Sequence, residues 1–150
     1  MRYPGYKEFE GMVFYSSPNK GPKAIPGEYL VSLNYNGEVI EQSLKIEKDP
    51  RLENTDKDYR DQFDFLINVR NQVTRANSAI IKIREVQKDL NYLKQKSGLT
   101  EEINNLINQF EIKLSHIENN IHMTKNQSRQ DPLNYGIRIN NRIAFLLADS

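Results

Sequence analysis

Cysteine and tryptophan are both absent from this chain of 150 residues. Without cysteine there is no disulfide, no catalytic thiol and no thiolate metal site, although the redox compartment stays open. Histidine is scarce: only His116 and His122 occur, six positions apart, so they do not share a helix face as an i, i+4 metal pair would. We therefore expect two solvated surface histidines and no metal or other cofactor.

Long apolar runs and an excess of one charge are also missing. No stretch approaches the roughly 20 apolar residues of a membrane-spanning helix, and the first residues lack the apolar core of an export signal. The 21 basic residues are opposed by 20 acidic ones. This balance gives no reason to expect nucleic acid or an anionic membrane as a partner.

Catalytic motifs are missing as well. The sequence offers no Ser-His-Asp order, no phosphate-binding loop and no pair of carboxylates with a plausible pocket. An acidic run at Asp56, Asp58, Asp61 and Asp64 lacks the glycine and the terminal glutamate of a calcium loop. We therefore expect this chain not to be an enzyme by itself.

What the chain does have is an abrupt change of apolar period at Asp49-Pro50-Arg51. Before this point the apolar residues alternate every second position, as in a β-strand, and after it they recur every seven residues, as in a packed helix. The change predicts a β module over residues 1–50 and a helical part over residues 51–150.

The β module contains a strong hairpin signal at Asn36-Gly37, the residue pair that favours a type I′ turn. This turn places Leu33 opposite Ile40, Val31 opposite Gln42 and Tyr29 opposite Leu44, which makes one face of the hairpin mostly apolar. A further strand is expected at Gly11–Ser16, joined to the hairpin by a loop over 17–27. Three strands are too few for a fibronectin-like sandwich, which needs about seven. Either the helices cover the open face or the missing strands lie upstream, and we favour an incomplete module whose other strands lie upstream.

The helical part begins with two long amphipathic helices. The first is predicted from Asp56 to about Lys96, with Thr55 or Asp56 as its cap, and the second from Thr100 to about Met123. The first carries a coiled-coil seam at Tyr59, Leu66, Val73, Ile80 and Gln87. The second carries a stripe at Ile103, Ile107, Phe110, Leu114, Ile117 and Ile121. A turn at Ser97-Gly98 should fold them into an antiparallel hairpin.

A short third helix is predicted from Asp131-Pro132, where the aspartate can cap and the proline can take the first helical position. Its apolar residues between Leu133 and Leu147 have no evident partner. The expected fold is therefore α+β: a small antiparallel hairpin or partial sandwich, followed by an antiparallel helical hairpin or bundle. Self-association is expected, through the open edge strand or this third helix.

Aromatic residues near the N-terminus are the candidate ligand or interface residues. They are Tyr3, Tyr6, Phe9, Phe14 and Tyr15. Aromatic faces stack on sugar rings, so one interpretation is a carbohydrate-binding platform. The simpler interpretation, which we favour, is that they belong to the core or to an interface of the incomplete β module.

An ordered series of short motifs carries a family resemblance. It comprises Arg2-Tyr3-Pro4-Gly5, Gly11-Met12, Gly21-Pro22-Lys23-Ala24, Pro26-Gly27-Glu28-Tyr29, Asp49-Pro50-Arg51 and Asp131-Pro132-Leu133-Asn134-Tyr135. Together these motifs resemble the C-terminal region of large bacterial sortilin-like proteins with BNR repeats, often labelled glycosyl hydrolases. The resemblance covers essentially the whole chain.

The resemblance implies a parent protein with an upstream β-propeller, then a fibronectin-like module, then this helical region, exported to the periplasm or cell surface. Two departures matter. The chain contains no Ser-x-Asp-x-Gly-x-x-Trp repeat, so no propeller activity is carried over to it. It also stops before a further helix that the family usually supplies, which implies an excised C-terminal fragment.

The sequence therefore predicts a non-catalytic accessory or interaction module of a larger exported BNR-repeat protein. Its expected partners are the upstream propeller of the parent, another protein or a second copy. The first alternative is a carbohydrate-binding accessory region of a glycoside hydrolase. A more remote one is a part that completes an active site in the parent.

Overall fold

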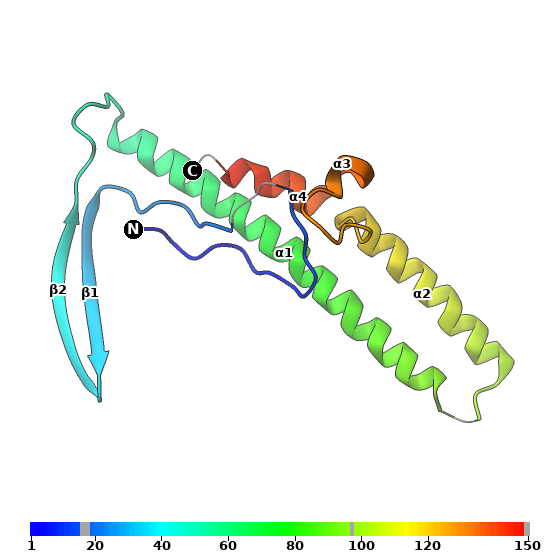
Figure 1. The fold of residues 1–150 in the computed structure, drawn as a ribbon. Coiled ribbons are helices and arrows are strands. Elements are labelled where there is room, and N and C mark those ends of the chain that lie inside the picture. The colour runs from blue at the N-terminus through cyan, green and yellow to red at the C-terminus, as the bar shows by residue number, and fades with distance from the viewer. Residues whose placement is uncertain (16–18, 97, 149–150) are drawn as a thin grey trace.

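The computed structural model describes residues 1–15, 19–96 and 98–148 and has a small α+β architecture, as predicted (Figure 1). Strands β1 (Gly27–Tyr35) and β2 (Glu38–Ile46) precede the long helix α1 (Asp56–Lys94) and helix α2 (Glu101–Ile121). The short helices α3 (Pro132–Tyr135) and α4 (Ile139–Ala144) and a 3-10 turn, η1 (Phe145–Leu147), follow. The hairpin stands at one end of α1, and α2 runs beside the other end.

The hairpin has the predicted register. Leu33 lies opposite Ile40, Val31 opposite Gln42 and Tyr29 opposite Leu44 in an antiparallel pair. The turn residues Asn36 and Gly37 have φ values of 50° and 86°, which a type I′ turn requires. The hydrophobic alternation and the turn specify the same pairing, so the register follows directly from the sequence.

Helix α1 begins where its capping residues predict. The Thr55 hydroxyl accepts a hydrogen bond from the Asp58 amide at 3.2 Å, and the Asp58 carboxylate accepts one from the Thr55 amide at 2.8 Å. This reciprocal pair satisfies two amides that have no partner within the helix. The helix then continues for 39 residues to Lys94, close to the expected end.

Helix α2 returns antiparallel to α1, which confirms the predicted helical hairpin. Gly98 lies in the connection with a φ of 96°, whereas Ser97, the other predicted turn residue, is outside the described residues. Thr100 caps α2 by accepting from the Ile103 amide at 3.3 Å. Three polar contacts join the helices: Arg84 to Glu118 at 2.8 Å, Gln87 to Ser115 at 3.2 Å, and Lys94 to Glu111.

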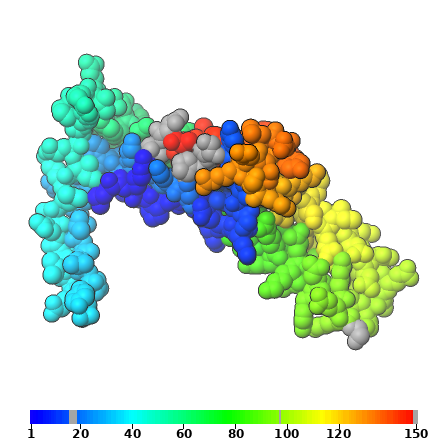
Figure 2. Space-filling view, in the orientation of Figure 1, coloured from blue at the N-terminus to red at the C-terminus, as the bar shows by residue number. Residues whose placement is uncertain are grey.

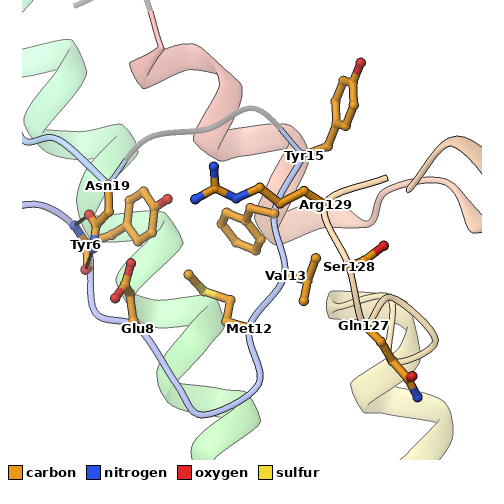
Figure 3. A pocket seen from close by; sticks show the side chains of 10 residues that line it. Tyr6, Glu8, Met12, Val13, Tyr15, Asn19, Gln127, Ser128 and Arg129 are labelled. Atoms are coloured by element: carbon orange, nitrogen blue, oxygen red, sulfur yellow. Dashed lines mark hydrogen bonds between the residues drawn. The ribbon is translucent and has the colours of Figure 1, made fainter. Parts of the chain in front are cut away.

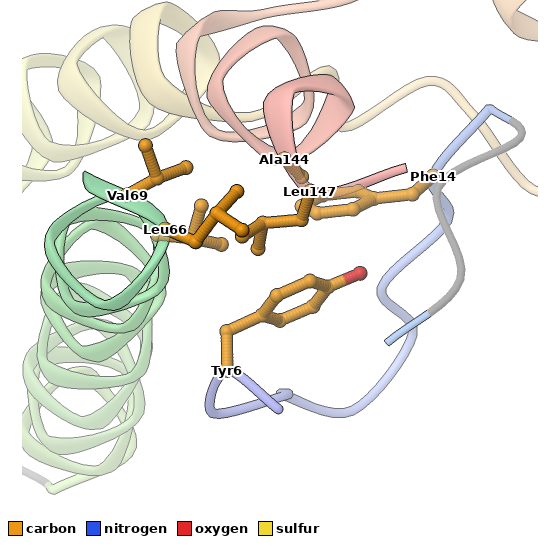
Figure 4. Close-up of a cluster of buried hydrophobic side chains, with 7 residues drawn as sticks. Tyr6, Phe14, Leu66, Val69, Ala144 and Leu147 are labelled. Carbon is orange, nitrogen blue, oxygen red and sulfur yellow. The ribbon is translucent and has the colours of Figure 1, made fainter. Parts of the chain in front are cut away.

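The core lies along α1, on the half that α2 does not reach. With 21 residues against 39, α2 is too short to cover the whole of α1. The remaining half is covered by residues 1–15, here called the N-terminal segment, and by α4 with η1 (Figures 1 and 2). The main cluster of buried side chains draws on all three parts (Figure 4), namely Tyr6, Phe14, Leu66, Val69, Val73, Ala144 and Leu147.

The predicted strand at Gly11–Ser16 is wrong for the residues described. Gly11–Tyr15 forms no strand, and Ser16 lies outside the described residues. Instead the N-terminal segment runs beside the helices: the Lys7 amide donates to the Thr74 hydroxyl at 3.1 Å, and the Tyr15 amide donates to the Asn141 side chain at 2.9 Å. Two of its amides therefore bond to helix side chains, and Gly11–Tyr15 joins no sheet.

The predicted third helix is divided. Gly136, with a φ of 75°, follows α3 and separates it from α4. Pro132 occupies the start of α3 as expected, but Asp131 does not cap it, because its carboxylate accepts from the amides of Gln127 and Ser128, at 2.7 Å each. The break turns Ala144 and Leu147 into the core, while Leu133, Ile139 and Leu146 stay exposed.

The division at residue 50 stays a prediction. The hairpin does stand apart from the helices, and among the described helices and strands β1 and β2 contact only each other. The N-terminal segment, by contrast, shares one core with α1, α4 and η1. The first 50 residues thus supply two structural parts with different surroundings.

Candidate functional site

The five candidate aromatic residues do not form one platform. Tyr6, Phe9 and Phe14 are buried, and Tyr6 packs against Phe14 with ring centroids 5.7 Å apart. Tyr3 packs edge-on against Phe63 of α1 at 4.9 Å, and Tyr15 lies 6.2 Å from Phe145 of η1. Core packing therefore accounts for three of the five. Only Tyr3 and Tyr15 keep substantial exposed surface, at 40% and 38%.

A pocket of about 690 Å³ lies between the N-terminal segment and the segment that follows α2 (Figure 3). Tyr6, Phe14 and Tyr15 contribute to its lining, so the structure brings three of the candidate aromatics together here. Glu8 enters from the N-terminal segment, and Arg129 enters from the segment after α2.

The backbone at Tyr6 is held by Asn19, whose side chain accepts from the Tyr6 amide at 2.8 Å and donates to the Tyr6 carbonyl at 2.9 Å. Burial raises the pKa of the Tyr6 phenol to about 12, and the negative charge of Glu8 adds to this rise. The phenol is therefore neutral at any physiological pH.

The pocket has room for a small ligand, but its described lining lacks the pair of carboxyl groups that glycoside hydrolysis needs. Among the described residues that line it, Glu8 is the only carboxylate, whereas glycoside hydrolysis uses a pair of carboxyl groups on either side of the scissile bond. Tyr6 and Phe14 are too buried to offer ring faces, so Tyr15 is the aromatic of this lining that could stack on a sugar. The arrangement suits one small polar ligand held between opposite charges.

A buried polar network that the sequence did not predict links α1, the end of α2 and α4. The side chains of Asn77 and Asn140 are fully buried. The side-chain nitrogen Nδ2 of Asn140 donates to Oδ1 of Asn77 at 3.1 Å and lies 3.3 Å from Nδ1 of His122. The Nδ2 of Asn77 in turn donates to the backbone carbonyl of Lys7 at 2.7 Å. One signal was present in the sequence: Asn77 falls between Val73 and Ile80, on the apolar face of the helix.

The expectation that both histidines are solvated is wrong for His122. Its ring is 2% exposed and packs edge-on against Phe9 at 4.9 Å. The reason is that α2 ends at Ile121, so His122 turns toward the core as the chain bends to reach α4. His116 is exposed, as expected.

Burial lowers the pKa of His122, and the positive charge of Arg84 lowers it further. Because the unfolded chain then takes up the proton more readily, this histidine's contribution to stability is complete above the unfolded pKa of about 6.5 and is lost as pH falls toward the folded pKa. We expect the free energy of unfolding to drop between about pH 7.5 and pH 5.5, with a slope of at most about 1.4 kcal/mol per pH unit. Urea unfolding at several pH values measures it.

The control for this prediction is the exposed histidine. His116→Gln should keep the wild-type pH slope, whereas His122→Gln should flatten it whatever its effect on absolute stability. Equal slopes in the wild type and in His122→Gln would show that His122 does not titrate on unfolding.

The hairpin offers the clearest unpaired surface. Its seven apolar residues on one side, here called the hairpin apolar face, are Tyr29, Val31, Leu33, Tyr35, Ile40, Leu44 and Ile46. Leu33, Ile40 and Tyr35 are 61%, 65% and 71% exposed. A two-stranded hairpin alone is marginally stable in water, so an exposed apolar face of this size is typical of an interaction surface.

Helix α2 is also incompletely covered. Ile107 and Glu118 face α1 and are buried, but Ile103, Leu106, Phe110 and Ile117 are exposed. The predicted stripe is therefore wider than the contact it makes with α1.

The described residues contain no group of three or more His, Cys, Asp or Glu side chains able to hold a metal ion. None of the helices in the described part of the chain combines the length and apolarity needed to cross a bilayer. A comparison with models of protein families found no match, and neither curated proteins nor solved structures matched the chain.

Proposed function

We propose that this chain is a non-catalytic C-terminal accessory module of a larger exported BNR-repeat protein, and that it docks on a β-rich part of that protein. The observation that carries the proposal is the hairpin apolar face, which the described helices leave uncovered. The opposite face of the hairpin is mostly polar, with Glu28, Ser32, Asn34, Glu41, Ser43 and Lys45. One apolar and one polar face are typical of a strand pair that covers one side of a sandwich.

The expected partner surface is the apolar side of a β-sheet. A sheet that packs face to face on the hairpin apolar face would bury Leu33 and Ile40, which lie opposite each other in the register. The sequence resemblance implies that the other strands of the fibronectin-like module and a propeller lie upstream in the parent chain, and either would offer such a sheet. The exported location is part of the same proposal and rests on the resemblance.

Amide exchange in the intact parent tests the docking. We expect the backbone amides of the hairpin to exchange at least about tenfold more slowly in the parent than in the 150-residue chain, because the docked interface must open before these amides can exchange. Ile40→Lys, which puts a charge on the apolar face, should abolish this difference. Ser32→Lys is the matched control, because Ser32 is exposed on the opposite face, and it should keep the protection.

Equal exchange rates in the parent and in the 150-residue chain would contradict the docking. Glycan hydrolysis by the parent is a second readout and should be unchanged by Ile40→Lys. A loss of hydrolysis would instead favour a module that completes the parent's active site.

The second candidate function is carbohydrate binding in the pocket of about 690 Å³, favoured by the meeting of Tyr15, Glu8 and Arg129 there. Calorimetric titration of the chain with defined oligosaccharides separates it from the first. Saturable binding that Tyr15→Ala removes would favour the carbohydrate interpretation, and heat of dilution alone would exclude it for the sugars used.

A further inference from the structure

The outer edge of β2 is an unpaired row of backbone donors and acceptors. Tyr35 and Glu38 flank the two-residue turn and form a hydrogen-bonded pair, so the bonding direction alternates along the strand from there. Val39, Glu41, Ser43 and Lys45 consequently direct their amides and carbonyls away from β1. No described helix or strand other than β1 contacts β2, and the hairpin projects from the body of the molecule (Figure 2).

This edge lacks the usual protection against pairing. Edge strands are commonly blocked by proline, by a bulge or by charges that repel an incoming strand. β2 contains no proline, its register with β1 is unbroken from Glu38 to Ile46, and its charges are of opposite sign at its two ends. Glu38 and Glu41 lie toward the turn, and Lys45 lies toward the base.

Opposite charges at the two ends make the edge complementary to itself. When two copies of β2 pair antiparallel about a two-fold axis at Ser43, Glu41 of each copy lies directly opposite Lys45 of the other. Ile40 lies opposite Ile46 in the same arrangement. Cross-strand ion pairs and apolar pairs at directly opposite positions stabilise a sheet.

The charges also select this register over its neighbours. Side chains alternate between the two faces of the sheet. A shift of the pairing is therefore allowed only if it leaves the apolar faces of the two hairpins on the same side of the sheet. With the axis at Gln42, Glu41 would meet Ser43 and the ion pairs would be lost. With the axis at Leu44, Glu41 would meet Glu47, a like-charge pair.

The edge of β1 offers no such match. Its outward-directed residues are Glu28, Leu30, Ser32 and Asn34, which include one charge and no cation. Antiparallel pairing of two β1 edges would therefore form no ion pair.

We propose that two copies of this chain associate through their β2 edges, with the two-fold axis at Ser43, to form a continuous four-stranded antiparallel sheet ordered β1-β2-β2-β1. Pairing at the edge lies in the plane of the sheet, so the hairpin apolar face stays open. The inference is therefore independent of the docking proposed above, and either can fail without the other.

A charge-exchange experiment tests the register. Glu41→Lys should weaken dimerisation at least about tenfold, because the introduced lysine then faces Lys45 of the other copy at two symmetric places, and Lys45→Glu should do the same. An equimolar mixture of the two variants should recover dimerisation near the wild-type level. In the mixed dimer, position 41 of each copy faces position 45 of the other, and both facing pairs then join a lysine to a glutamate. Sedimentation equilibrium over a concentration series measures each association constant.

Mixing separates association from folding within one chain. Glu41 accepts a hydrogen bond from Ser32, and Lys45 lies opposite Glu28 and pairs with Glu47. Each substitution disturbs these contacts in its own chain, and mixing cannot restore them. Failure of the mixture to recover, or variants that dimerise as the wild type does, would overturn the proposal and would instead favour association through the exposed stripe of α2. A wild-type chain that stays monomeric at millimolar concentration would overturn it too.

Oxidative cross-linking locates the axis, since the chain has no natural cysteine. Ser43→Cys should form a disulfide-linked dimer, because residues on the two-fold axis lie within disulfide reach. Leu30→Cys is the matched control: Leu30 lies opposite Ser43 on the same face, but three strand spacings, about 14 Å, would separate the two copies. Cross-linking of Leu30→Cys as fast as Ser43→Cys would overturn the assignment of the β2 edge.

Discussion

Replacing Ile80 with alanine is expected to lower the free energy of unfolding by about 2 to 5 kcal/mol. Ile80 is fully buried on α1, and removing most of its side chain deletes apolar contacts and leaves a cavity that the neighbouring helix cannot fill without moving. Urea or guanidinium unfolding, followed by the circular dichroism of the helices, measures the difference.

Phe110→Ala is the matched comparison. Phe110 belongs to the apolar stripe of α2 that the sequence assigns to the helical contact, yet it is 51% exposed. Truncating it in the monomeric chain should therefore cost less than about 1 kcal/mol, since a side chain that is half in water loses less on truncation. Equal losses at the two positions would show that α2 packs on α1 with a different face.

Asn77→Ala is the second substitution with a large expected effect, a loss of about 2 to 4 kcal/mol. The Asn77 side chain accepts from Asn140 and donates to the Lys7 carbonyl, and both asparagines are fully buried. Its removal takes away the oxygen that accepts the hydrogen bond from the Asn140 side chain. A buried polar group left without a partner costs about 1 to 3 kcal/mol. Denaturant unfolding tests this loss.

Asn68→Ala is the control for this prediction. Asn68 lies on the exposed side of the same helix, so its loss should change stability by no more than about 0.5 kcal/mol. A second readout is local: amide exchange of the N-terminal segment should speed up in Asn77→Ala, because the hydrogen bond to Lys7 is gone. An Asn77 variant as stable as the Asn68 variant would mean that the network contributes no net stability.

Local signals predicted the hairpin and the two long helices well. Asn36-Gly37 predicted the register, Thr55 or Asp56 as the cap predicted the start of α1, and the apolar periods predicted the helix types. Each of these signals acts within a few residues, or within one repeating pattern, and needs no knowledge of the rest of the fold.

The apolar period of a helix could not predict which other segments of the chain pack against it. The sequence assigned the whole seam of α1 to α2, but α2 is too short, and the N-terminal segment and α4 cover the other half. A short apolar run such as that of Gly11–Tyr15 is equally compatible with a strand in a sheet and with an extended segment lying on a helix. The burial of His122 likewise depends on how the chain bends after α2.

The N-terminal segment has a consequence for the order of events during synthesis. Its contacts include the Tyr15 amide with the Asn141 side chain, 126 positions later in the chain, and a core in which Tyr6 meets Leu147. A ribosome releases Tyr6 long before α4 exists, so the nascent segment must remain without its final neighbours while α1 and α2 emerge and pair. Contacts between residues so distant in sequence form slowly. The helical hairpin should therefore acquire structure on the ribosome before the core that the N-terminal segment shares with α4, and the aromatic residues at the start of the chain should be the last to leave water.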